Sequence, residues 1–337
     1  MWAQKIKKMS FRIKLEFHVH IHWKKKNKEV DQKDYEDGMG TKTFCMSAIE
    51  EIERLKLMMS RSTIENYLTA LRSFQDFLLE SSSDDYLDSD LFRQYEHWLH
   101  NRMVKPNTIS CYMRSLRSLV TKIYGDDGRC MFKHVYTGLA ATDKRSISVE
   151  EIVKLRNLRL KEGSFLSLTR DLFLFSFYAF GMPFVDMAFF QRSQISDGKF
   201  TYYRHKTGQQ VTVKIEACMQ EIIERYQGNS DFYVFPLIHA TNPHDAYDEY
   251  LKMLNHYNRA LKSLAKIAGV DHQLTSYVTR HSWASIAYDN NIDLSVISKA
   301  LGHANPQHTL IYIRQINDSR LYDANQQILE KALKNKT

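Results

Sequence analysis

After its first 46 residues, most of the chain carries apolar side chains at the spacing of amphipathic helices. Residues 62–65 read Ser-Thr-Ile-Glu, a helix capping box, and the segment that follows has apolar residues at Ile64, Tyr67, Leu68, Leu71, Phe74 and Leu78. A second segment covers residues 91–99. A third begins at Pro106 and has apolar residues at Ile109, Tyr112, Met113, Leu116, Val120 and Ile123. This pattern predicts a helical domain over residues 47–137.

The second half predicts a different organisation. Residues 125–144 have few periodic apolar positions, so we expect a linker at 138–147 and a second domain over 148–337 that begins with a capping box. An unusually apolar stretch at residues 169–190 predicts two buried helices interrupted near Gly181. Asp-Gly and Thr-Gly turn signals at residues 197–198 and 207–208 predict three short antiparallel strands. Helical periodicity returns over residues 216–227, 247–268, 277–290, 293–301 and 319–333. The expected fold class is mainly α with a small antiparallel sheet.

The first 46 residues read as a basic extension. Apolar residues alternate along residues 11–23, which is a strand signal without a neighbouring partner strand. His18, His20 and His22 share one face of that strand, but no further ligand cluster accompanies them, so a solvated polar face is favoured over a metal site. Residues 1–44 hold 11 Lys/Arg against 6 Asp/Glu. We expect residues 1–44 to be dispensable for folding and catalysis, so that a chain starting at Met46 would still fold.

Composition narrows the function classes. The formal net charge is +8, which suits a polyanionic partner, although much of the excess lies in the extension. The 4 cysteines are scattered without Cys-x-x-Cys spacing, which disfavours a zinc site or a disulfide framework and fits a reducing cytoplasm. We expect no membrane span. Without a glycine-rich phosphate loop, no nucleotide or other cofactor is implied.

One group of residues suggests phosphate chemistry. Arg280 stands beside His281, His303 follows a Leu-Gly pair, and Tyr312 lies nine positions further on. Each residue alone has an ordinary structural explanation: Gly302, for example, could end a helix in a left-handed conformation. Together, arginine and histidine can hold a phosphate and a tyrosine hydroxyl can attack it. The grouping and its spacing resemble the tyrosine recombinases, whose motif reads His-x-x-Arg, then Leu-Gly-His, then a nucleophilic tyrosine.

The resemblance implies roles for five residues. Tyr312 would attack the scissile phosphate and form a 3′-phosphotyrosine bond, and Arg280 would bind that phosphate through two hydrogen bonds. His303 would donate to a non-bridging oxygen, and Lys206, at the second hairpin turn, would protonate the leaving oxygen. Tyr277 stands where the motif has its first histidine, and a phenol can still donate to a phosphate oxygen. No metal ion is implied.

The segment from Pro106 to Arg117 resembles the core-binding domain of the same family, a small helical bundle. Arg114, Arg117 and Lys122 lie opposite the apolar positions of this segment; they either form a solvated face or contact DNA phosphates. The resemblance implies a core-binding domain, a catalytic domain with a C-terminal exchange helix, and a homotetramer on two sites in double-stranded DNA. Accessory DNA-bending proteins are a further expected class of partner, and the expected location is the bacterial cytoplasm, at the nucleoid.

One residue departs from the family pattern. Residues 177–182 read Phe-Tyr-Ala-Phe-Gly-Met, so that Phe180 stands where the family has its first phosphate-binding arginine. Arg192, Arg204 and Arg170 are the nearby cations that could replace it. Three interpretations stay open: an active recombinase for inversion, integration or excision; a catalytically impaired relative that binds specific DNA; and a type IB topoisomerase, which the core-binding signature disfavours.

Overall fold

The chain forms two compact units, Met1–Ala141 and Thr142–Thr337, and their boundary falls inside the expected linker. The computed structural model describes residues 40–81, 86–140, 146–228, 232–240, 242–305, 307–310, 325–326 and 328–330. The alternating segment at residues 11–23 and its histidines lie outside the described residues, as does most of the expected last helix. Among the described helices, none is both long enough and apolar enough to cross a membrane.

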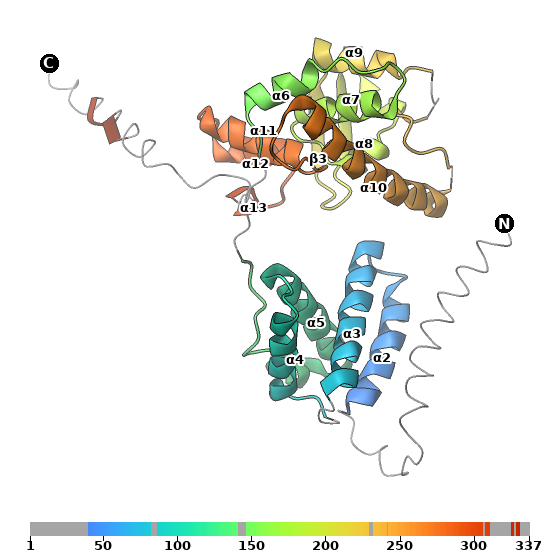
Figure 1. Ribbon diagram of the computed structural model, residues 1–337, viewed down its shortest axis with the longest axis vertical. Helices are drawn as coiled ribbons and strands as arrows, with labels where there is room; N and C mark the ends of the chain where they lie inside the picture. Colours follow the sequence, from blue (N-terminus) through green and yellow to red (C-terminus); the bar gives the residue numbers. More distant parts are fainter. Residues whose placement is uncertain are drawn as a thin grey trace. The chain divides into compact units, whose positions relative to one another are not determined.

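The described residues of the first unit form a bundle of four helices, drawn in blue and teal in Figure 1. They are α2 (Thr41–Leu55), α3 (Arg61–Ser81), α4 (Ser89–Asn101) and α5 (Pro106–Cys130). Helices α2, α3 and α4 all contact α5, and their apolar faces close over a single core. The three amphipathic helices expected from the sequence are confirmed as α3, α4 and α5.

Two details of this bundle correct the sequence-based expectation. Helix α2 begins at Thr41 and buries Phe44 completely, so the basic extension ends before residue 46 and a truncation there would remove part of the core. Burial also raises the pKa of the Cys45 thiol to about 12. Helix α3 begins at Arg61, ahead of the expected capping box, because Ser60 Oγ accepts the backbone N–H of Thr63 at 3.3 Å.

The second unit is mainly helical around a small sheet. Its elements before and within the sheet are α6 (Val149–Arg156), α7 (Phe165–Tyr178), α8 (Phe184–Ala188), η2 (Arg192–Gln194), β1 (Ile195–Ser196), β2 (Lys199–Tyr203) and β3 (Gln210–Lys214). The remaining described helices are α9 (Ala217–Arg225), α10 (Pro243–Ala268), α11 (Val278–Asp289), α12 (Leu294–Ala300) and α13 (Gln307–Leu310).

Helix α7 is the centre of this unit, because α6, α9, α10 and α11 all pack against it (Figure 1). Its apolar stretch predicted a buried helix pair, and α7 and α8 confirm that prediction. The three strands form one antiparallel sheet in the order β1-β2-β3, as the two turn signals predicted. Phe200 pairs with Val213 and Tyr202 with Val211, and these four side chains are buried. The β2–β3 loop, residues 204–209, carries Lys206.

Candidate active site

A tight turn between α7 and α8 packs directly against α11. Its residues Phe180 and Gly181 both have positive φ, 59° and 68°. Ser176 Oγ fastens the turn, because it donates to the Met182 carbonyl at 2.7 Å and lies 2.7 Å from Thr279 Oγ1 on α11. A Cβ on Gly181 would lie only 2.5 Å from the Cα of Arg280. Glycine is therefore required for the approach of this turn to α11.

Arg280 and His303 are in direct contact, although 23 positions separate them. Arg280 is 2% exposed, and its Nη1 donates to the Gly181 carbonyl at 3.2 Å. Its Nη2 donates to the Leu301 carbonyl and lies 2.9 Å from His303 Nε2. Because arginine only donates, Nε2 accepts, and the proton then sits on Nδ1, which is 2.8 Å from Thr309 Oγ1. Thr309 on α13 thus fixes the histidine tautomer.

The Leu-Gly-His segment is at once a helix cap and part of the site. Gly302 has φ 63° and follows the end of α12, as the structural explanation of this residue predicted. The backbone N–H of His303 donates to the Ser298 carbonyl at 3.1 Å, which closes the cap. This cap turns the chain so that the Leu301 carbonyl and the His303 ring both face Arg280.

The β2–β3 loop docks on the same cap. Thr207 Oγ1 donates to the Gly302 carbonyl at 3.3 Å, and Arg204 Nη1 donates to the Leu301 carbonyl. Lys206 lies between these two residues and is exposed. The loop therefore brings the expected lysine to the neighbourhood of Arg280 and His303.

A buried ion pair supports the start of this loop. Arg204 Nε lies 2.9 Å from Asp186 Oδ2, and the backbone N–H of His205 donates to Asp186 Oδ1 at 2.8 Å. Burial raises the pKa of Asp186, while the His205 N–H and the Arg204 charge oppose that rise. Sequence reasoning missed Asp186. The available signal was that the apolar stretch of residues 169–190 holds two carboxylates, Asp171 and Asp186, because a buried carboxylate needs a cation or hydrogen-bond donors.

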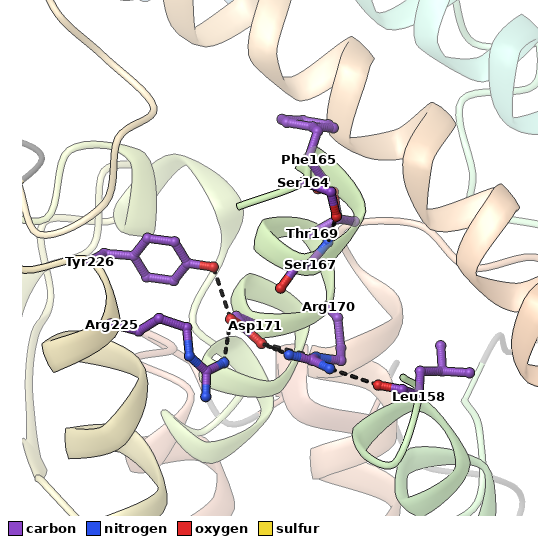
Figure 2. Close-up of polar contacts among 9 residues, drawn as sticks. All are labelled: Leu158, Ser164, Phe165, Ser167, Thr169, Arg170, Asp171, Arg225 and Tyr226. Carbon is purple, nitrogen blue, oxygen red and sulfur yellow. Dashed lines mark hydrogen bonds and ion pairs between the residues drawn. The ribbon is translucent and has the colours of Figure 1, made fainter. Parts of the chain in front are cut away.

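Arg170, one of the three candidate replacement cations, is held elsewhere. Figure 2 shows its guanidinium between the Asp171 carboxylate and the Leu158 carbonyl, at 2.9 and 2.8 Å. Arg225 and the Tyr226 hydroxyl bind the other oxygen of Asp171, at 2.6 and 2.8 Å. This cluster ties α7 to α9, so Arg170 has a structural role in the fold.

The remaining positions named from the sequence lie in different surroundings. The Phe180 ring packs on Trp283, with centroids 5.3 Å apart, and Arg192 Nη2 donates to the Tyr226 carbonyl at 3.0 Å. Tyr277 immediately precedes α11 and is 46% exposed. Tyr312 lies outside the described residues. Across the described part of the chain, no group of three or more His, Cys, Asp or Glu side chains could hold a metal ion.

Basic residues also gather on α5 of the first unit. Arg114 and Lys122 are exposed, and Arg117 is half-buried. Arg117 lines a cavity of about 380 Å³ together with Arg129 and Lys133. Arg129 and Lys133 come after Gly125, whose φ of 70° interrupts α5. The periodic apolar positions of this helix had predicted its end near that glycine.

Two family models match the chain, one for each unit. The model described as the phage integrase family matches residues 170–318, and the phage integrase SAM-like domain matches residues 43–127. The SAM-like domain thus falls on the helical first unit, and the phage integrase match covers the unit that holds Arg280, His303 and the β-hairpin. The chain belongs to the tyrosine recombinase, or phage integrase, family.

Known proteins resemble the chain along most of its length. A tyrosine recombinase XerD of Halalkalibacterium halodurans is 23% identical over 288 residues, which cover 80% of this chain and 92% of the relative. The structure of the Tn1549 transposon integrase in complex with transposon right end DNA has a TM-score of 0.63 at 12% identity, covering 86% and 98% of the two chains. A lambda integrase tetramer bound to a Holliday junction has a TM-score of 0.60 at 12% identity, covering 80% and 77%. These structures share the fold.

Proposed function

We propose that the chain is a site-specific recombinase that cuts and rejoins double-stranded DNA through a 3′-phosphotyrosine intermediate. One observation carries this proposal above the others: Arg280, buried on α11, lies 2.9 Å from His303 at the end of α12. The pair brings a cationic guanidinium and an imidazole together, and these are the two groups that the motif assigns to the scissile phosphate. The DNA-bound Tn1549 integrase supports a DNA substrate.

The proposed reaction is a transesterification. The Tyr312 oxygen attacks the scissile phosphorus, the bond from phosphorus to the 5′ oxygen breaks, and a phosphotyrosine ester forms. The tyrosine hydroxyl loses one proton and the leaving 5′ oxygen gains one, so the step needs no water, metal ion or nucleotide. Attack by the free 5′ hydroxyl of another strand reverses the step and releases Tyr312.

Electrostatics supports the assignment of the remaining groups. The pentacovalent transition state carries more negative charge than the diester, so donors fixed in a buried site stabilise it preferentially. Arg280 is such a donor, and the Thr309 contact orients His303. Lys206, on the exposed loop, is assigned to protonate the leaving oxygen, and Tyr277 to donate to a phosphate oxygen.

We infer that the first unit contributes phosphate contacts. Arg114, Arg117 and Lys122 are assigned to the DNA backbone, together with Arg129 and Lys133 at the same cavity. The lambda integrase tetramer on a Holliday junction supports assembly of four copies on two sites. Inversion, integration and excision share this chemistry, and the bacterial cytoplasm is the proposed location.

The proposal is tested by covalent trapping. A binding site is first selected from a random duplex library, and a nick is then placed next to the scissile phosphate so that the short 5′-hydroxyl product diffuses away. Wild-type protein should accumulate a denaturant-resistant adduct, in which mass spectrometry finds a DNA 3′-phosphate on Tyr312. Specific binding without any adduct would contradict the proposal.

Specific DNA binding without a covalent adduct is the result expected for the second candidate function. In that case the chain is a catalytically impaired relative that acts as a sequence-specific DNA-binding protein. Phe180 is the observation that favours it, because a phenyl ring packed on Trp283 cannot neutralise a phosphate. Loss of one electrostatic donor typically slows a reaction by about 10²–10³-fold. An active enzyme with Phe180 therefore needs a cation from elsewhere.

A further inference from the structure

Two guanidinium groups converge on one carbonyl oxygen in the second unit. Nη2 of Arg280 and Nη1 of Arg204 both donate to the Leu301 carbonyl. Donors to one oxygen must lie close to each other, so two positive charges sit side by side in a buried site. The two side chains are similarly buried, at 2% and 5% exposure. Asp186, paired with Arg204 at 2.9 Å, offsets part of the repulsion between them, but one carboxylate carries a single negative charge against two positive ones.

The position of Arg204 is fixed by its surroundings. Asp186 holds its Nε at 2.9 Å, and the Leu301 carbonyl holds Nη1. Its side-chain carbons are also close to the α12 cap, because a Cβ on Gly302 would lie 2.9 Å from Arg204 Cγ. Arg170 and Arg192 donate to groups outside this cluster. Arg204 is thus the one candidate of the three that shares an acceptor with Arg280.

We propose that Arg204 is a catalytic residue that binds the scissile phosphate beside Arg280 and supplies the positive charge that Phe180 lacks. This inference rests on the proposed recombinase function. The cation comes from the β-hairpin loop, two positions before Lys206, and Asp186 acts as its positioning residue. The charge develops on the non-bridging oxygens in the transition state, so Arg204 accelerates cleavage more than it strengthens DNA binding.

The competing explanation is that Arg204 only fastens the hairpin to the fold. Arg204→Met removes the guanidinium and keeps an unbranched side chain. Arg170→Met is the matched control, since Arg170 is also a largely buried arginine paired with a buried aspartate and backbone carbonyl. Arg204→Lys keeps a charge without the planar fork and serves if Arg204→Met does not fold. Thermal unfolding and DNA affinity are measured for each variant.

The deciding measurement compares two nicked substrates in single-turnover trapping. One has the natural scissile phosphate, and the other has a neutral methylphosphonate there. Arg204→Met should slow adduct formation by about 10²–10³-fold on the phosphate, with a much smaller loss on the methylphosphonate. Arg204→Lys should fall between wild type and Arg204→Met. Arg170→Met should affect both substrates equally.

The outcomes separate the two proposals. If wild-type protein forms no adduct on either substrate, the recombinase function itself fails. If wild type forms adducts and the Arg204 variants lose equal activity on both substrates, or lose none, Arg204 has no contact with phosphate charge and this inference alone is overturned.

Discussion

Replacing Gly181 by alanine should show how strongly the α7–α8 turn controls Arg280. Gly181 has φ 68°, and its added Cβ would lie 2.5 Å from Arg280 Cα and 2.9 Å from Arg280 Cβ. Gly198, in the β1–β2 turn, also has φ 68° but would meet nothing within 4 Å. The two glycines therefore share the backbone strain and differ in the collision, which makes Gly198→Ala a matched control.

The expected magnitudes follow from these two effects. Gly198→Ala should cost about 1–2 kcal/mol, the penalty for an L side chain in the left-handed conformation. Gly181→Ala should cost the same amount plus about 1–3 kcal/mol, because backbone and side chain of α11 must shift to relieve the overlap. For a domain of this size that extra cost corresponds to roughly 2–12 °C in melting temperature.

Both variants are examined by thermal unfolding and by covalent trapping at a temperature where each is folded. Gly181→Ala should melt below Gly198→Ala and form adduct more slowly, because the shift displaces the guanidinium that contacts His303 and Leu301. Equal melting temperatures and equal trapping rates in the two variants would refute the reasoning, since the turn would then yield without moving Arg280.

Other expected outcomes follow from the proposed chemistry. Tyr312→Phe should abolish adduct formation and leave DNA affinity nearly unchanged; an adduct in that variant would point to another nucleophile. Adduct formation should proceed equally in EDTA and in magnesium, and strict magnesium dependence would contradict a metal-free mechanism. Glutamate at Arg114 and Arg117 should flatten the dependence of log affinity on log salt by about 0.9 for each phosphate that is no longer neutralised; an unchanged slope would place the DNA-binding surface elsewhere. Phe180→Arg should give no gain in trapping rate while Arg204 is present, and a gain of about 10²-fold or more would show that the wild-type site lacks a cation.

Local patterns in the sequence predicted most of the elements in this fold. Periodic apolar positions identified α3, α4 and α5, and two glycine turns identified the three-stranded sheet. The errors lay at element ends, where competing groups are close in sequence. Ser60 and Ser62 both precede the apolar positions of α3, and hydrogen bonding selects Ser60 as the cap. The start of α2 at Thr41 could not be predicted, because the residues around it are as polar as those of the preceding basic extension.

From the sequence, only those site residues could be predicted that occur at the motif's characteristic spacing. Arg280 and His303 stand out by their motif, and the structure brings them together. Arg204 had no such signal, because its place depends on the docking of the β2–β3 loop onto the end of α12. The partner aspartate, Asp186, lies in a stretch that reads as apolar core. Arg204 and Asp186 reach the site only through tertiary contacts, which the periodicity of the sequence does not encode.

Gly302 explains why the structural and functional interpretations of Leu-Gly-His are compatible. Its φ of 63° ends α12, and its missing side chain admits the hairpin, because a Cβ there would lie 2.8 Å from Val211 Cγ2 and 2.9 Å from Arg204 Cγ. The same glycine thus turns His303 toward Arg280 and lets the loop with Arg204 approach. If both guanidinium groups bind phosphate, the cap of α12 is the structure that holds Arg204 next to Arg280. Any side chain at residue 302 would then move the hairpin away from Arg280.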